Sequence, residues 1–120
     1  MALKNNFKRE SEKIEDLILE RYNPDFKATV GKGDGVLKTG QLLAYDETDG
    51  KYYKYQKGDA KKGIAATMLI NDIDTTDSDI TTSLFAAGAI NKKLVIGLED
   101  DNYKAINELR KYNIYVREVK

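Results

Sequence analysis

The first twenty-two residues show a helical hydrophobic pattern. Asn23-Pro24 ends it, because proline drives the residue before it out of the α region. The segment is highly charged and free of glycine, and it predicts an amphipathic helix over about residues 5–22. A helix this short is marginal alone, so it is expected to dock on its own domain or on a partner. The apolar positions at this spacing are Leu3, Phe7, Ile14, Leu17, Ile18 and Tyr22.

From residue 26 the pattern changes to short β-prone runs between turn residues. Residues 42–45 and 51–55 flank Asp49-Gly50, which suits positions with positive φ, so this stretch predicts a hairpin. Residues 64–70 and 81–87 predict two further strands. Gly88 interrupts the second, and pairing is expected to resume at Ala89 and Ile90.

The C-terminal part predicts a helix followed by a strand. Tyr103, Ile106, Leu109 and Tyr112 share a helix face that starts near Asp100 or Asp101 and ends at Asn113. Residues 114–119 alternate apolar with polar side chains, as in a half-buried strand. With about six or seven short strands and two helices, the predicted class is α+β, a small and mainly antiparallel β-sheet or partial barrel.

The composition limits the partners and the kinds of functional site that the protein can have. At 120 residues the chain is most simply one domain, and its 20 Lys and Arg balance its 20 Asp and Glu, so nucleic acid and membrane are not expected partners. The absence of Cys and His excludes disulfides, Cys/His metal sites and histidine-based catalysis. A charged N-terminus and no long apolar run indicate a soluble protein made in the cytoplasm.

The segment GKGDGVLKTGQL, residues 31–42, has the glycine spacing of a phosphate-binding P-loop, but Leu42 stands where that motif requires Ser or Thr. Gln41 stands where that motif requires lysine, and the residues after it have a strand pattern instead of a helical one. The glycines predict two tight turns, with positive φ at Gly33 or Gly35 and at Gly40.

An aspartate cluster suggests a calcium loop but fails the EF-hand template. Asp77 stands where the template needs Gly, and Ser83 stands where it needs a bidentate Glu. Asx-turns in a surface loop are the expected use of these carboxylates, and no metal is predicted. The cluster consists of Asp72, Asp74, Asp77 and Asp79.

Four tyrosines lie on or next to the predicted hairpin. Stacking on nucleic-acid bases would need surrounding basic residues, but acidic residues stand among the nearby lysines, so cross-strand packing is the expected role. No pair of carboxylates stands out by its spacing, and no enzymatic activity is predicted. The tyrosines are Tyr45, Tyr52, Tyr53 and Tyr55.

The order of segments resembles the lambda-type bacteriophage head decoration proteins. YNPDFKATVGKGDGVLKTGQLLAYD resembles the family's N-terminal arm, glycine turn and first core strand, and GKYYKY its next hairpin arm. KGIAATMLINDIDTTDSDITTSLFAAGAIN resembles the strand, acidic loop and second strand of the family core. LEDDNYKAINELRKYNIYVREV resembles the closing helix and strand, with Asn113 in place of the family's glycine.

The resemblance implies a β-tulip-like core over residues 31–120, preceded by an arm over residues 1–30. It further implies a cofactor-free structural protein that forms a homotrimer and binds the phage major capsid protein. Its place would be the three-fold sites on the outer surface of the expanded head, after synthesis in the bacterial host, where it stabilises the virion. The implied capsid contacts are Tyr22, Asn23, Phe26, Thr29 and Val30.

The trimer contact is expected in the apolar stretches at residues 64–70 and 84–90, with Leu84, Phe85 and Ile90 as candidates. Two alternatives stay open. A barrel-sandwich carrier or adaptor module would present a modified lysine at a hairpin such as Asp49-Gly50-Lys51, and a carbohydrate-binding module would use the tyrosines.

Overall fold

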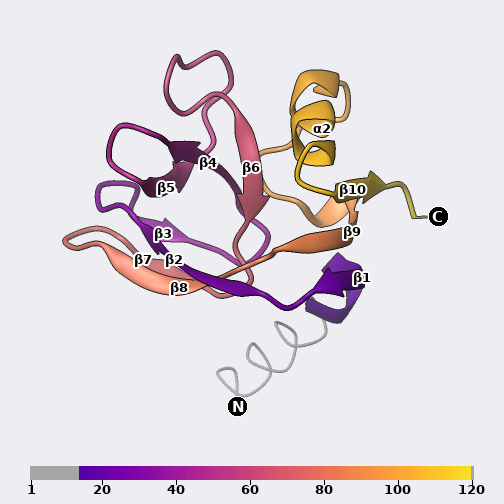
Figure 1. Cartoon of the computed structure of the whole chain (residues 1–120), viewed down its shortest axis with the longest axis horizontal. Helices are drawn as coiled ribbons and strands as arrows, with labels where there is room; N and C mark the ends of the chain where they lie inside the picture. The colour runs from indigo at the N-terminus through magenta and orange to yellow at the C-terminus, as the bar shows by residue number, and fades with distance from the viewer. Residues whose placement is uncertain (1–13, 120) are drawn as a thin grey trace.

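The structure is a computed structural model that describes residues 14–119. Its elements confirm the α+β class, with a helix before the last strand (Figure 1). In chain order they are β1 (Ile18–Asn23), β2 (Phe26–Val30), β3 (Val36–Leu37), β4 (Leu42–Asp46), β5 (Lys51–Lys54), β6 (Ala65–Met68), β7 (Ile73–Asp74), β8 (Ile80–Leu84), β9 (Ala87–Asn91), the 3-10 turn η1 (Lys92–Leu94), α2 (Tyr103–Arg110) and β10 (Ile114–Arg117).

Most strand pairs are antiparallel, as predicted. Within residues 14–119 the strands form sheets of order β6-β4-β5-β2-β8, β1-β9-β10 and β3-β7. The pairs β9–β10 and β2–β5 are parallel. A parallel pair needs a crossover connection, and α2 lies within the one that joins β9 to β10, which explains the helix before the last strand.

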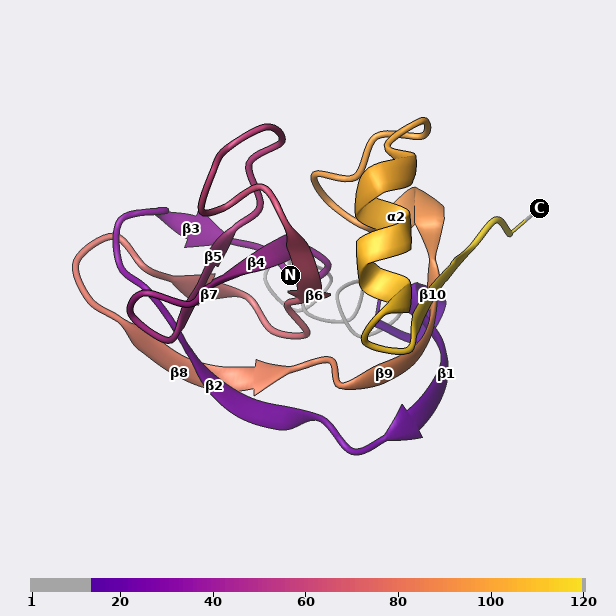
Figure 2. The same ribbon diagram turned by 45° about the horizontal axis from the view of Figure 1, so that its top comes forward.

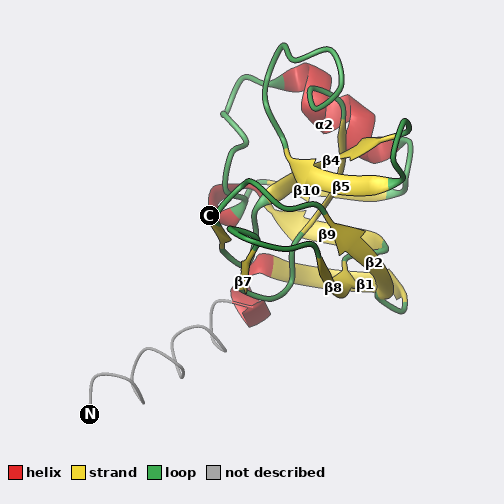
Figure 3. Cartoon of the chain, turned by 90° about the vertical axis from the view of Figure 1, so that its left-hand side faces the viewer, coloured by secondary structure: helices red, strands yellow, loops and turns green. Residues whose placement is uncertain are grey.

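A long two-stranded ribbon runs along one side of the molecule. β1 and β2 pair with β9 and β8 respectively, and the register continues across the break, since Asn23 faces Ala87 and Phe26 faces Leu84. Figure 2 shows the two chain segments running side by side along this curved ribbon. Figure 3 shows α2 at the opposite end of the molecule from β1, β2 and β8.

The ribbon corrects the predicted N-terminal arm. Residues 14–17 are helical, but Ile18–Asn23 is strand β1, so the predicted helix over residues 5–22 is wrong from Ile18 onward, and residues 5–13 lie outside the described part. Leu17 and Ile18 are buried, and β1 pairs with β9. This pairing with a distant strand outweighs the helical spacing of the apolar residues in the local sequence. The boundary between arm and core at residue 30 is likewise wrong, because residues 18–30 belong to the folded domain.

The core divides into two clusters. The larger one lies between α2 and the strands β1, β4, β6, β9 and β10, and the smaller one lies under β2, β3 and β8. The helix turns Ala105, Glu108 and Leu109 inward. The predicted helix face is therefore wrong for Tyr103 and Tyr112, whose side chains are exposed.

The ends of α2 are set by two asparagines. The Asn102 side chain accepts a hydrogen bond from the backbone N–H of Ala105 at 3.1 Å, so it is the N-cap in place of the predicted Asp100 or Asp101. Asn113 has a φ of 63° and ends the helical turn, as predicted. No helix within residues 14–119 combines the length and the apolar character needed to cross a bilayer.

Candidate functional site

The glycine-rich segment turns the chain, as predicted. Gly33, Gly35 and Gly40 have positive φ, and the segment leads directly into strand β4. The buried Gln41 side chain donates to the backbone carbonyl oxygens of Leu42 at 3.1 Å and Ile96 at 3.3 Å. Gln41, which stands in the place of the P-loop lysine, thus connects two backbone segments of the protein by hydrogen bonds.

The acidic loop is tied to the protein's own backbone. Asp74 accepts from the backbone N–H of Thr76 at 2.9 Å and from its hydroxyl, which confirms an Asx-turn, and the hydroxyl lowers the Asp74 pKa most. Asp79 lies 2.8 Å from the Lys51 ammonium and accepts from the Lys32 N–H at 2.9 Å. The Lys51 ammonium, followed by the Lys32 N–H, lowers the Asp79 pKa below its usual value.

Asp72 holds the turn that precedes β4. Its carboxylate accepts from the backbone N–H of Thr39 at 2.7 Å and from the Thr39 hydroxyl at 2.9 Å. Within the part of the chain that the structure describes, no three His, Cys, Asp or Glu side chains are grouped so that they could hold a metal ion. The contacts of Asp72, Asp74 and Asp79 stabilise this loop and the turns next to it.

The predicted capsid-contact residues fall into two groups. Tyr22 and Asn23 lie exposed at the end of β1. Phe26 and Thr29 are half-buried, and Val30 is fully buried, which corrects its assignment as a contact. β2 pairs with β8 from Phe26 to Val30, and with β5 at Val30.

The predicted trimer contacts are wrong. Leu84, Phe85 and Ile90 each have 0% exposed surface and lie in the core of their own domain. The backbone carbonyl of Phe85 also accepts a hydrogen bond from the Thr67 hydroxyl at 2.5 Å. An apolar stretch indicates burial, but it does not say whether the same chain or a second copy covers it.

A surface that joins β1 to β10 across β9 is exposed. The rings of Tyr22 and Tyr115 have centroids 6.2 Å apart, and Arg117 Nη1 lies 2.6 Å from Glu20 Oε2. We call these four residues the β1–β10 surface. They meet because β9, which lies between the two outer strands, has the small residues Ala87, Gly88 and Ala89 at this point.

Gly88 determines how closely β1 approaches β9. It has a φ of +147°, and a Cβ at this position would lie 2.0 Å from the backbone oxygen of Glu20. Its N–H donates to the Asn113 carbonyl at 3.0 Å, which also fixes the start of β10. A side chain at residue 88 would therefore separate the strands that form the β1–β10 surface.

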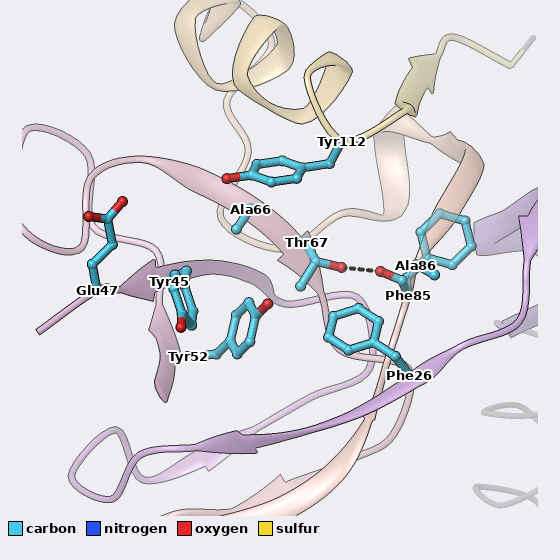
Figure 4. A pocket seen from close by; sticks show the side chains of 9 residues that line it. All are labelled: Phe26, Tyr45, Glu47, Tyr52, Ala66, Thr67, Phe85, Ala86 and Tyr112. Carbon is cyan, nitrogen blue, oxygen red and sulfur yellow. Dashed lines mark hydrogen bonds between the residues drawn. The ribbon is translucent and has the colours of Figure 1, made fainter. Parts of the chain in front are cut away.

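A second feature is a pocket with a volume of about 280 Å³, which we call the aromatic pocket (Figure 4). The Tyr45 and Tyr52 rings, which face each other across the hairpin, have centroids 4.9 Å apart. Phe26 adds a third ring, 6.1 Å from Tyr52, and Tyr112 lies across the opening from these rings (Figure 4). The complete lining is Phe26, Tyr45, Glu47, Tyr52, Ala66, Thr67, Phe85, Ala86 and Tyr112.

The predicted cross-strand packing of tyrosines is confirmed for Tyr45 and Tyr52. Tyr53 instead donates to Asp49 at 2.5 Å, and this hydrogen bond raises the pKa of Tyr53 to about 12. Tyr55 is buried. The sequence did not indicate Tyr112 as a pocket residue, because its spacing groups it with Leu109 on one face of the predicted helix.

The electrostatics of the aromatic pocket are simple. Burial, and then the neighbouring hydroxyls of Tyr45 and Tyr112, raise the pKa of Tyr52, so its hydroxyl is neutral over the physiological range. Among the nine described residues that line the pocket, only Glu47 is charged. The pocket therefore presents aromatic faces, phenolic hydroxyls and one carboxylate.

Comparison with known proteins gives no match to a protein-family model and none to a curated protein. The described residues nevertheless define two separate features with the chemistry of a binding site. The β1–β10 surface and the aromatic pocket have no residue in common.

Proposed function

We propose that this protein is a head decoration protein of the lambda type, a structural cement without enzymatic activity. It binds the outer surface of an expanded bacteriophage head at three-fold sites as a homotrimer and stabilises the shell. The order of sequence segments supports this proposal, and so does the α+β fold with its helix before the closing strand. The partner is the phage major capsid protein.

The single observation that carries the contact is the position of β1. In the described part of the chain, β1 is one of the two edge strands of its sheet and pairs with β9 alone. An edge strand leaves backbone N–H and C=O groups for pairing with another chain. Strand addition at this edge is a common way of recognising an extended segment of a partner. We therefore propose the contact at β1, where the candidates Tyr22 and Asn23 are exposed.

The side chains on this edge suit a protein interface. Tyr22 and Tyr115 expose 49% and 38% of their surface while their rings touch. Tyrosine and arginine are enriched among the residues that contribute most to binding. Arg117 lies beside them in its pair with Glu20. One such patch per copy is small, but three linked copies on one shell site multiply a modest affinity.

A cement protein also gains its effect through mass action. A protein that binds only the expanded lattice stabilises that lattice by an amount set by its concentration relative to the dissociation constant. No catalytic group and no cofactor are needed for this function. The balanced charge of the chain is compatible with a contact based on shape and backbone pairing.

The carrier alternative depends on a lysine that is free at the hairpin. Lys51 follows the Asp49-Gly50 turn, but its ammonium lies 2.8 Å from Asp79 and this pairing raises the Lys51 pKa. A lysine presented for modification has to reach the active site of another enzyme. The ion pair therefore counts against the carrier function.

The test is co-sedimentation of the purified full chain with expanded, undecorated heads of a phage that encodes it. We expect saturable binding at three copies per three-fold site. Tyr22→Ala should weaken binding by about ten- to thirtyfold, as for an interface residue that contributes roughly 1.4–2 kcal/mol. Tyr103→Ala is the matched control, since Tyr103 is exposed on α2, away from β1.

Two outcomes would contradict the proposal. Wild-type protein that stays in the supernatant at every head concentration would refute the decoration function itself. Saturable binding that Tyr22→Ala and Tyr103→Ala weaken equally would keep the function but refute the β1 edge as the contact. Melting curves of both variants establish that each is folded.

A further inference from the structure

The aromatic pocket has no role in the β1–β10 surface, and its side chains point to a ligand of their own. The Tyr52 ring lies between those of Phe26 and Tyr45, with centroid distances of 6.1 Å and 4.9 Å respectively. Tyr112 lies across the opening from them (Figure 4). The face of an aromatic ring carries the negative part of its quadrupole, so rings around a small volume favour a positive charge.

The charge of the lining favours the same kind of ligand. Glu47 lies at the side of the pocket next to Tyr45, and it is the charged member of the nine lining residues (Figure 4). Because Lys and Arg are absent from this lining, no lysine or arginine inside the pocket competes for the aromatic faces, and Lys61 lies on the outer side of Tyr45 and Glu47. An anion would meet a carboxylate and the negative faces of the rings, so an anionic ligand is disfavoured.

The hydrogen-bonding groups restrict the cation further. The Thr67 hydroxyl is already bonded to the Phe85 carbonyl at 2.5 Å. A metal ion or a primary ammonium is strongly hydrated and would need several oxygen partners to replace its water. An alkylated ammonium has few or no N–H groups to satisfy, and its methyl groups pack on aromatic faces. Aromatic cages of this kind recognise quaternary ammonium groups.

The size of the pocket agrees with a small head group. Its volume of about 280 Å³ lies just below the usual range for ligand sites, roughly 300–1,000 Å³. A trimethylammonium group with a short chain fits such a volume, whereas an oligosaccharide would extend beyond it. The pocket is also open to solvent, because Tyr45 and Tyr112 are exposed at its rim.

We propose that the aromatic pocket binds an alkylated ammonium group, with Tyr45, Tyr52 and Tyr112 surrounding the cation and Glu47 balancing its charge. The group is that of choline and its relatives or of a methylated lysine side chain. Both sources carry the same alkylated ammonium group. This inference does not depend on the decoration function, since the pocket shares no residue with the β1–β10 surface.

The first test titrates the full chain with tetramethylammonium and, in parallel, with 3,3-dimethyl-1-butanol, a neutral compound with the same shape as choline. Calorimetry and NMR shifts should show saturable binding of the cation. The neutral compound should bind about tenfold more weakly, because it lacks the cation–π attraction. Choline and a trimethyllysine peptide, each against its unmethylated counterpart, then identify the source of the group.

Variants test whether the rings act as proposed. Tyr112→Leu keeps an apolar side chain but removes the ring, and it should weaken tetramethylammonium binding by about three- to thirtyfold. Tyr103→Leu is the matched control, because Tyr103 is an exposed tyrosine on the same helix that does not line the pocket. Glu47→Gln should weaken cation binding and leave binding of the neutral compound unchanged.

Several results would overturn the inference. Equal affinity for tetramethylammonium and the neutral compound would show that the pocket binds apolar groups and that the positive charge contributes nothing. Saturable binding of a monosaccharide or oligosaccharide, with no response to the cation, would assign the tyrosines to carbohydrate. An absence of saturable binding to every probe, or an equal loss in Tyr112→Leu and Tyr103→Leu, would likewise refute it. None of these results depends on whether the protein binds phage heads.

Discussion

The side-chain amide of Asn102 donates a hydrogen bond to the Tyr55 hydroxyl oxygen at 3.0 Å, and both residues are buried. The carbonyl oxygen of the same amide accepts from the backbone N–H of Ala105 at 3.1 Å. One side chain thus caps α2 and fixes the start of the helix to the end of the β4–β5 hairpin. Residues 47 positions apart in sequence are held together by this contact.

Asn102→Ala is expected to lower the free energy of unfolding by about 1–3 kcal/mol, because it removes the cap and leaves the Tyr55 hydroxyl without this donor. Tyr55→Phe should cost less, since the cap remains. Urea denaturation measures both. Asn107→Ala is the control, because Asn107 is exposed on the same helix and should change stability little. Equal stability of Asn102→Ala and wild type would contradict the assigned role.

Glu108 connects the opposite side of α2 to β6. Its carboxylate accepts from the buried backbone N–H of Ala65 at 2.9 Å and from the Lys104 ammonium at 2.6 Å. Glu108→Ala should lower the free energy of unfolding by about 1–3 kcal/mol, because a buried N–H loses its acceptor. Glu108→Gln keeps an acceptor and should cost less. Glu99→Ala, at a carboxylate in an exposed pair, serves as the control in the same denaturation series.

Two glycines of the turn segment should respond differently to substitution. At Gly40 a Cβ would lie 2.8 Å from the Leu94 backbone oxygen, and φ is +93°. At Gly35 φ is +72°, but a Cβ would meet nothing within 4 Å. Gly35→Ala should cost about 1–2 kcal/mol of unfolding free energy from backbone strain alone. Gly40→Ala should cost more, because the backbone has to move as well, and equal losses would contradict this difference.

The Asp79–Lys51 pair predicts a change of stability in acid. The lowered Asp79 pKa means that the ionised carboxylate is favoured in the folded state. Its contribution is therefore present above the unfolded pKa, near 3.8, and is lost as the pH falls through the lower folded value. Asp79→Asn should be less stable than wild type at neutral pH, and the difference should shrink below pH 3.8.

Thermal melts from pH 2 to pH 7 check this prediction. Asp77→Asn is the control, since Asp77 is an exposed residue of the same loop, and its difference from wild type should be small throughout. A difference between Asp79→Asn and wild type that stays constant across the acid range would show that the ionisation of Asp79 does not stabilise the fold.

The parts of the fold that depend on local chemistry could be predicted from the sequence. Asp49-Gly50 marks the hairpin turn, and Gly50 adopts the positive φ that this turn requires. Asn113 likewise ends α2 with a positive φ. In each case the residue determines the backbone conformation within a few positions, so no knowledge of distant partners is needed.

The parts that depend on distant partners could not be predicted in the same way. Residues 18–22 fit a helical period as well as a strand, and the choice is made by β9, far along the chain. Leu84, Phe85 and Ile90 were correctly recognised as apolar, but the sequence does not show which surface buries them. Phe26 and Tyr112 both line the aromatic pocket although they lie far apart in the sequence, and no local pattern shows this.

The strand order β1-β9-β10 also determines when the domain can finish folding. β1 (Ile18–Asn23) pairs with β9 (Ala87–Asn91), and α2 lies in the crossover that connects β9 to its parallel neighbour β10. Contacts of such long sequence separation carry a large loop-closure cost and slow the folding reaction. During synthesis β1 leaves the ribosome before β9, so β1 stays unpaired with β9 until β9 has emerged. The edge that we assign to shell binding therefore forms as one of the last steps in the maturation of each molecule.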